Sequence, residues 1–212
     1  MNHDPTTILQ QLRAFVPTRP LELHEAKAIA EHQAVKLLSI LDQYEPPVNV
    51  GLIAELPRIE VRVVPNRDIG GLSGATQWDR TKGRWLVAIN RDDSKTRRRF
   101  TLAHEFKHVL DNRRTTVLYP KRLYGAQTEQ VVEQMCDWFA ACLLAPRPWV
   151  KRLWTQESQD PAVLAATFNI SPAAMNIRLE QLGLVEPRQR WHRQVTRTYF
   201  RRSLVQPLGA MA

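Results

Sequence analysis

Apolar residues recur at helical spacing in the first quarter of the chain. The segment 24–41 repeats them at intervals of three and four residues, which predicts a scaffold helix with one face in the core. Pro46 and Pro47 stop this helix because proline cannot continue it. The preceding residues, 1–20, are polar and contain prolines, and we expect them to form a flexible N-terminal segment.

The pattern changes in the middle of the chain. Residues 59–64 alternate between apolar and polar, residues 72–78 do so more weakly, and residues 85–89 form an apolar run, so each segment predicts a strand. Half of the eight glycines lie between these segments and indicate turns or bulges: Gly70, Gly71, Gly74 and Gly83. We therefore expect a small three-stranded sheet.

Helical periodicity returns after the predicted sheet. Ser94 begins a helix that runs to about Asp111, and a loop over 113–126 separates it from a second helix over 129–144. Thr128 is placed to cap this second helix. Strands followed by a run of helices predict an α+β fold.

The C-terminal part is also helical in pattern. Asp160 and Ser171 each stand before a proline, which predicts an N-cap followed by the first helical residue. The segment 164–179 has the pattern of a helix-turn-helix (HTH), whose second helix can contact DNA. The exposed positions that we expect on this second helix are Asn176, Arg178 and Gln181. We favour the other interpretation, a helical subdomain that buttresses the rest of the protein or contacts a partner.

Composition places the chain among ordinary globular proteins. Its 212 residues are 43% hydrophobic and 24% charged, which is enough for a sizeable core. The N-terminal residues lack the apolar stretch of a signal peptide, and the most apolar segment, 139–146, is too short to span a bilayer. We expect a soluble, cytoplasmic protein with no membrane partner.

The net charge of +9 is concentrated at the C-terminal end. The stretch 187–212 has no acidic residue, and six arginines stand in it: Arg188, Arg190, Arg193, Arg197, Arg201 and Arg202. Such a tail can bind nucleic acid or an acidic partner surface. Because the rest of the chain is only mildly basic, the overall charge is a weak argument for nucleic-acid binding.

The clearest chemical pattern lies in the first helix after the sheet. His104 and His108 are four residues apart, so their imidazoles share one side of the helix and can bind one ion. Zinc accepts neutral imidazole nitrogen in tetrahedral sites. Glu105 lies one step round the helix, where it can take the proton of a water molecule that attacks a carbonyl group. The alternative, two satisfied histidines on a surface helix, fits the context of a preceding sheet less well.

The third protein ligand can be sought by elimination. A histidine on an extended turn would fall at position 114, which is Arg114, so the ligand has to come from another element. Glu133 and Asp137 are four residues apart on the next helix and share a face. We assign Glu133 as the metal ligand and Asp137 as the carboxylate that accepts the remaining ring N–H of a ligand histidine.

Other residues compete for this role. Glu129, one turn earlier on the same helix, is the main rival of Glu133, and Asp111 is a weaker one because it shares a helix with both histidines. Cys136 lies near the same face, and we interpret it as a small core residue. Cys136 and Cys142 are six residues apart and point to different faces, so they cannot bridge each other.

Four segments together resemble a known family. Residues 98–108, which contain both histidines, resemble the zinc-binding helix of the ImmA/IrrE metallo-endopeptidases. Residues 133–146 resemble the second signature of that family, and residues 71–74 and 86–90 resemble its strands before the zinc helix. The resemblance covers about residues 24–185.

The resemblance implies a zincin-like domain of the gluzincin type and a zinc-dependent endopeptidase that acts inside the cell. Members of the family typically cut a transcriptional repressor of the HTH type, often encoded beside them, and so release genes of mobile elements or stress responses. Other members act in toxin–antitoxin pairs. The residues that match the family motifs position by position are His104, Glu105, His108, Glu133 and Asp137.

Two positions depart from the family pattern. Lys107 stands where the family usually has a small residue, often Gly, and Met135 stands where a second acidic residue is common. Neither residue is expected to touch the proposed ligands. We expect Lys107 to alter the access of the substrate.

Three further features bear on substrate binding. Tyr119 or Tyr124, in the loop after the zinc helix, is a candidate donor to the oxyanion. Arg98 and Arg99 can steer an acidic substrate, although such charges more often form a solvated helix face. A substrate peptide can add to an open sheet edge, for which the strand over 85–89 is our candidate.

These predictions combine into four regions: a flexible segment over 1–20, a zincin-like metallopeptidase domain over 21–150, a helical HTH-like subdomain over 151–186 and a basic tail over 187–212. The expected function is cleavage of an HTH-type repressor or antitoxin by a zinc-dependent endopeptidase. The alternative is a DNA-binding or toxin–antitoxin regulatory protein that keeps a zinc site without proteolysis.

Overall fold

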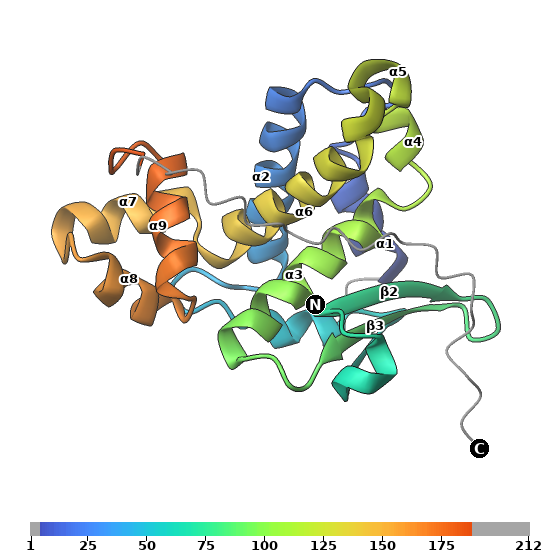
Figure 1. Ribbon diagram of the computed structural model, residues 1–212, viewed down its shortest axis with the longest axis horizontal. Coiled ribbons are helices and arrows are strands. Elements are labelled where there is room, and N and C mark those ends of the chain that lie inside the picture. Colours follow the sequence, from blue (N-terminus) through green and yellow to red (C-terminus); the bar gives the residue numbers. More distant parts are fainter. Residues whose placement is uncertain (1–4, 188–212) are drawn as a thin grey trace.

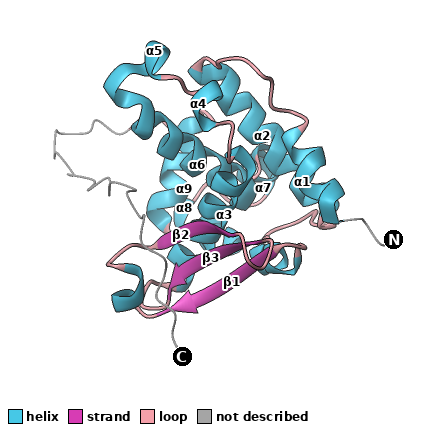
Figure 2. Cartoon of the chain, turned by 90° about the vertical axis from the view of Figure 1, so that its right-hand side faces the viewer, coloured by secondary structure: helices cyan, strands magenta, loops and turns pink. Residues whose placement is uncertain are grey.

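A small sheet covered on one face by helices makes up the protein (Figure 1, Figure 2). The computed structural model describes residues 5–187. The sheet comes from the middle of the sequence, and helices from both ends of the described chain stack on the same side of it (Figure 2). The predicted α+β fold, with a three-stranded sheet and packed helices, is confirmed.

The strands are β1 (Ile59–Val64), β2 (Gly74–Asp79) and β3 (Arg84–Asn90), in the order β1-β3-β2. β1 runs parallel to β3, and β2 runs antiparallel to it. β3 is therefore the central strand, and the burial of both its faces explains its continuous apolar run. The expectation that residues 85–89 offer an open edge is wrong, because β1 and β2 occupy both edges of β3.

Two helices and a short 3-10 turn precede the sheet: α1 (Pro5–Arg13), α2 (Leu23–Ile40) and η1 (Val50–Glu55). α2 confirms the helix predicted over 24–41. The expectation of a flexible segment over 1–20 is wrong for α1, since Leu12 is fully buried and joins the main core. The apolar spacing of Ile8, Leu9 and Leu12 is compatible with a helix. A segment this short forms a stable helix only when it packs against other elements, and α1 packs against α2 and α3.

Two long helices follow the sheet, α3 (Lys95–Asp111) and α6 (Thr128–Leu144). α3 lies across β2 and β3, and α6 packs against both α3 and α2 (Figure 1). Ser94, where the helix was expected to begin, is the N-cap of α3, because its hydroxyl accepts a hydrogen bond of 3.2 Å from the Arg97 amide. The cap predicted at Thr128 is wrong: Thr128 is the first helical residue of α6, and its hydroxyl donates to the Gly125 carbonyl.

The loop expected over 113–126 contains three short helical turns instead. They are α4 (Thr115–Leu118), α5 (Lys121–Tyr124) and η3 (Gly125–Gln127). A further short turn, η2 (Asn66–Ile69), follows β1. Turns of this length carry too few positions to show a hydrophobic period, so the sequence could not reveal them.

The C-terminal helices are α7 (Arg147–Gln156), α8 (Pro161–Phe168) and α9 (Pro172–Gln181), and they gather at one end of the molecule (Figure 1). The caps predicted at Asp160 and Ser171 are confirmed by hydrogen bonds from the amides of Ala162 and Ala174. The prediction that Arg178 is exposed for DNA contact is wrong. Arg178 is 1% exposed, and its Nε donates to the Ala145 carbonyl at 2.9 Å.

Within residues 5–187, no helix combines the length and the apolar character needed to cross a membrane. The predicted boundaries at 20, 150 and 186 stay predictions. The arginines of the predicted basic tail lie outside the described residues.

Candidate metal centre

Helices α3 and α6 bring two histidines and a carboxylate together. His104 Nε2 lies 3.2 Å from Glu133 Oε2, and His108 Nε2 lies 3.4 Å from Glu133 Oε1. The two Nε2 atoms are 3.2 Å apart. His104, His108 and Glu133 thus form a triangle of residues, with both histidines on one side of α3 and a different carboxylate oxygen of Glu133 facing each of them from α6.

This triangle has the size that a zinc ion requires. Zinc binds histidine nitrogen and carboxylate oxygen at about 2.0–2.2 Å in tetrahedral sites, so neighbouring ligand atoms lie about 3.3–3.6 Å apart. Two imidazoles and one carboxylate also leave a fourth position, as in catalytic rather than structural zinc sites. The residues therefore fit a zinc ion by donor type, number and spacing.

A second carboxylate from α6 orients the first histidine. His104 Nδ1 lies 3.0 Å from Asp137 Oδ1. With its proton on Nδ1, His104 donates to Asp137 and presents the lone pair of Nε2 toward His108 and Glu133. Asp137 thus contacts the ring nitrogen of His104 that faces away from Glu133, and its role beside a metal ligand stays a prediction.

The electrostatics of the centre favour a positive charge. Burial lowers the pKa of His104, but hydrogen bonds with Asp137 and Glu133 outweigh burial and raise the pKa to about 9. Burial raises the pKa of Glu133, but its contacts with His104 and His108 outweigh burial and hold the pKa well below its usual range. An ionised carboxylate beside two imidazoles is suited to hold a cation.

Glu105 lies buried beside this triangle and is held by the edge strand β2. It is 5% exposed, and the Thr76 hydroxyl donates to its Oε2 at 2.6 Å. A Cβ atom at Gly74 would overlap the Thr101 side chain and lie 3.2 Å from Glu105 Oε1. Glycine at position 74 thus lets β2 pass close to α3. The sequence argument did not identify Thr76 or Gly74 as part of this site.

The rival ligands have different surroundings. Asp111 is buried in an ion pair of 2.7 Å with Lys107, and this pairing makes it a poor candidate for a metal ligand. Glu129 is exposed at the start of α6. Cys136 is buried as expected, but its sulfur and one nitrogen from each of His104 and His108 lie within 4.8 Å of one another. Interpreting Cys136 only as a core residue overlooked this proximity.

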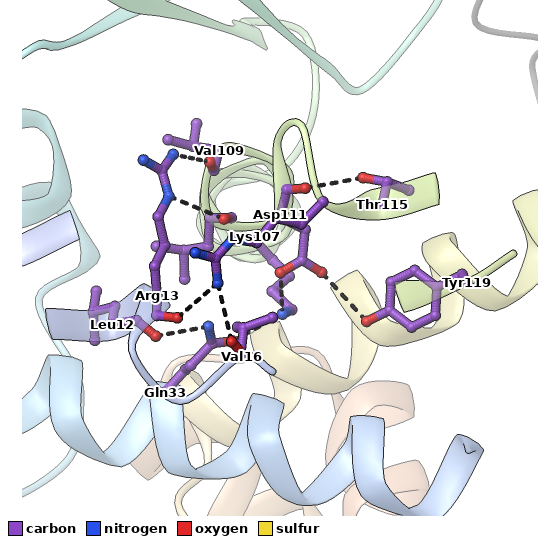
Figure 3. Close-up of polar contacts among 11 residues, drawn as sticks. Leu12, Arg13, Val16, Gln33, Lys107, Val109, Asp111, Thr115 and Tyr119 are labelled. Carbon is purple, nitrogen blue, oxygen red and sulfur yellow. Dashed lines mark hydrogen bonds and ion pairs between the residues drawn. The ribbon is translucent and has the colours of Figure 1, made fainter. Parts of the chain in front are cut away.

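α3 also carries a buried network of polar side chains that is directed toward α1 and α2 (Figure 3). Lys107 Nζ donates to Gln33 Oε1 at 2.8 Å and to Asp111 Oδ1 at 2.7 Å. The Tyr119 hydroxyl donates to Asp111 Oδ2 at 3.3 Å, and Gln33 Nε2 donates to the Leu12 carbonyl at 2.9 Å. We call Gln33, Lys107, Asp111 and Tyr119 the anchoring network, because they tie α3 to α2, to the turn after α4 and to α1.

Arginines reinforce this anchor at the C-terminal end of α3. Arg13 donates to the carbonyls of Val109 and Leu110 at 2.7 and 3.1 Å (Figure 3). The last carbonyls of a helix lack partners within it, and a cation there also complements the helix dipole. Arg114 in turn donates to the carbonyls of Arg13 and Val16. The N-terminal segment is thereby fixed to the end of the helix that bears the histidines.

The anchoring network corrects two predictions. Lys107 was expected to alter substrate access, but it is 1% exposed and donates to Gln33 of α2. Tyr119 and Tyr124 were candidate oxyanion donors, but the Tyr119 hydroxyl donates to Asp111 and the Tyr124 hydroxyl donates to the Leu21 carbonyl.

Arg99, on another part of α3, is not on a solvated face, since its Nε donates to the Asn169 carbonyl between α8 and α9.

Comparisons with known proteins agree with this architecture. Residues 59–180, more than half of the chain, match the family Peptidase_M78, described as the IrrE N-terminal-like domain. No curated protein matches the chain.

A solved structure of similar fold is a "Mycobacterium tuberculosis transcriptional regulator", with a TM-score of 0.57 and 16% sequence identity. The similarity covers 89% of this chain and 54% of that one, so this chain spans about half the length of the regulator. At this identity the similarity shows the fold alone. The family match contains the β-sheet and the helices that carry His104, His108 and Glu133, and the chain belongs to the IrrE N-terminal-like family, as its sequence signatures predicted.

Proposed function

We propose that this protein is a zinc-dependent endopeptidase, with His104, His108 and Glu133 as metal ligands and Glu105 as general base. The observation that carries the proposal is the triangle of residues, whose facing nitrogen and oxygen atoms lie 3.2–3.4 Å apart, beside the buried carboxylate of Glu105. Membership of a peptidase family supports the same type of function.

The side chains have separate tasks in this proposal. A zinc ion held by His104, His108 and Glu133 would polarise the scissile carbonyl and lower the pKa of a water molecule. Glu105 would accept the proton of the attacking water and pass it to the leaving amine nitrogen. The hydrogen bond from Thr76 holds Oε2 of Glu105, so the carboxylate does not have to reorient before it accepts a proton.

The edge strand β2 is the proposed place for the substrate backbone. No other strand among residues 5–187 pairs with the outer edge of β2. An extended peptide that adds to this edge would gain main-chain hydrogen bonds. Because Thr76 of β2 contacts Glu105, such a peptide would run past the proposed base.

The proposed substrate is a repressor of the HTH type or an antitoxin. The support for it is the resemblance of residues 98–108 and 133–146 to the ImmA/IrrE signatures, since members of that family typically cut such proteins. If the protein does not cleave such a repressor or antitoxin, the substrate assignment is wrong, but the proposed metal ligands and general base are not contradicted.

The test combines metal content with cleavage. Wild-type protein, Glu105→Gln and Glu133→Ala are purified and analysed for zinc per chain, and each is incubated with the HTH-type protein encoded nearest to it. We expect one zinc in the wild type and in Glu105→Gln, and a lower zinc content in Glu133→Ala. Cleavage, followed by mass spectrometry, should fall by about 10²–10⁴-fold in Glu105→Gln. Unchanged cleavage in that variant would remove Glu105 as the base.

A second candidate is a regulatory protein that keeps the metal site without proteolysis. The observation in its favour is the similar fold of a transcriptional regulator, together with the HTH-like pair α8 and α9. It predicts DNA binding that weakens as salt rises and that depends on residues 187–212. The burial of Arg178 argues against α9 as the helix that contacts DNA bases. A lack of DNA binding at low salt would exclude this candidate.

A further inference from the structure

A buried thiol lies next to the proposed metal ligands. Cys136 comes from α6, three residues after Glu133, so both side chains leave the same side of that helix. It is 1% exposed, and its sulfur and one nitrogen from each of His104 and His108 lie within 4.8 Å of one another. The other cysteine of the same helix, Cys142, packs in the main core instead.

The spacing allows the sulfur to become a metal ligand. In a tetrahedral site, zinc lies about 2.3 Å from a thiolate sulfur and about 2.0–2.1 Å from a histidine nitrogen, which puts the two atoms about 3.6 Å apart. The sulfur therefore has to approach each histidine nitrogen by about 1.2 Å or less, and a change of its side-chain rotamer can supply such a movement. Nitrogen, oxygen and sulfur donors are all common in zinc sites.

We propose that Cys136 is a fourth ligand of the metal centre, whose thiolate can take the position that a zinc peptidase leaves open for water. This inference rests on the proposed zinc site. Four protein ligands make a closed site, of the kind that holds zinc without catalysis. When the metal–sulfur bond forms, the thiol releases its proton to solvent, and the proton returns when the bond breaks.

The consequence is a centre with two forms. With the thiolate bound, zinc is held tightly and water has no coordination position, so the protein would bind metal while cleaving slowly. With the thiol withdrawn, the ligands are His104, His108 and Glu133, and Glu105 has a water molecule to act on. Cys136 would then limit hydrolysis until the sulfur is displaced.

Cobalt reports the sulfur ligand directly. Co²⁺ takes the same nitrogen, oxygen and sulfur donors as zinc, and a thiolate bound to it gives a charge-transfer absorption band in the near ultraviolet. The full chain is loaded with Co²⁺, its metal content is measured, and the spectrum is recorded for the wild type, Cys136→Ala and the matched control Cys142→Ala. We expect the band in the wild type and in Cys142→Ala but not in Cys136→Ala. The Kd for zinc should rise by about 10–100-fold in Cys136→Ala alone.

Each outcome decides between the proposals. One cobalt per chain with no charge-transfer band in the wild type would overturn the role of Cys136 and leave the peptidase proposal intact. A wild type that binds neither cobalt nor zinc would overturn both. If Cys136→Ala does not fold by circular dichroism, Cys136→Ser replaces it, and the wild-type spectrum remains decisive.

Discussion

Helix α3 presents buried polar groups on two sides, and the two sets are arranged differently. Toward α6, the Nε2 atoms of His104 and His108 face each other and Glu133 at 3.2–3.4 Å. Toward α1 and α2, Lys107 and Asp111 pair at 2.7 Å and share their remaining hydrogen bonds with Gln33 and Tyr119.

The difference lies in the balance of donors and acceptors. In the anchoring network, the donors of Lys107 and Tyr119 meet the acceptors of Gln33 and Asp111. Such a network specifies how segments pack. Toward α6, the carboxylates of Glu133 and Asp137 contact the two imidazoles, and a metal ion can take the place of imidazole protons there, because histidine must be deprotonated to bind it. The side toward α1 and α2 should therefore determine stability, and the side toward α6 should determine metal binding.

The largest effect is expected from Lys107→Met, which breaks the anchoring network. Asp111 would keep its Tyr119 hydrogen bond but lose the buried cation that compensates its charge. Removal of one partner of a buried ion pair costs about 3–5 kcal/mol in the free energy of unfolding. Chemical denaturation of the metal-free protein measures it.

Two controls sharpen this prediction. The exposed Lys151→Met should change the free energy of unfolding by no more than about 0.5 kcal/mol. The double variant Lys107→Met/Asp111→Leu should recover most of the loss, because an apolar pair can replace a buried ion pair at little cost. A stable Lys107→Met single variant would contradict the importance of the network.

Tyr119→Phe should have the next largest effect. Burial raises the pKa of the Tyr119 hydroxyl, so it stays protonated and donates to the Asp111 carboxylate. Loss of a hydrogen bond to a charged group costs about 1.5–3 kcal/mol in unfolding free energy. Zinc affinity should change little, since the Tyr119 hydroxyl donates to Asp111, which is not one of the proposed ligands. A Tyr119→Phe variant with normal stability but weakened zinc binding would reverse the assignment of the two sides.

Asp137→Asn tests the side toward α6. The amide can keep the shape of the carboxylate but loses the charge that orients His104. Loss of such a supporting group typically weakens metal binding by about 10–100-fold, or about 1.4–2.7 kcal/mol. The Kd for zinc, from competition with a chelator, checks this. An unaltered Kd would show that Asp137 does not support the metal ligand.

The smallest effect is expected from Glu129→Ala. Glu129 is exposed at the start of α6, whereas Glu133 contacts both histidines. We expect the zinc Kd and the free energy of unfolding to change by no more than about 0.5 kcal/mol. Loss of zinc from Glu129→Ala, with zinc retained in Glu133→Ala, would exchange the roles of the two carboxylates.

Much of the site could be predicted because its pairs are local. His104 and His108 share a side of α3, and Glu133 and Asp137 share a side of α6, through the helical period alone. The caps at Asp160 and Ser171 followed from a capping side chain directly before a proline. The order of strands in the sheet did not follow, because apolar runs show burial but not which strand is central.

By itself, the sequence determined the helices and strands that carry the candidate site, the α+β class, and which pairs of side chains share one side of a helix. These depend on periodicity and on spacings of three or four residues. Only the tertiary structure decided that Lys107 anchors α3 to α2, that Thr76 and Gly74 meet Glu105, and that Cys136 lies near both histidines. Those contacts join segments that are distant along the chain, and their geometry is fixed by the packing of helices on the sheet, which no local pattern encodes.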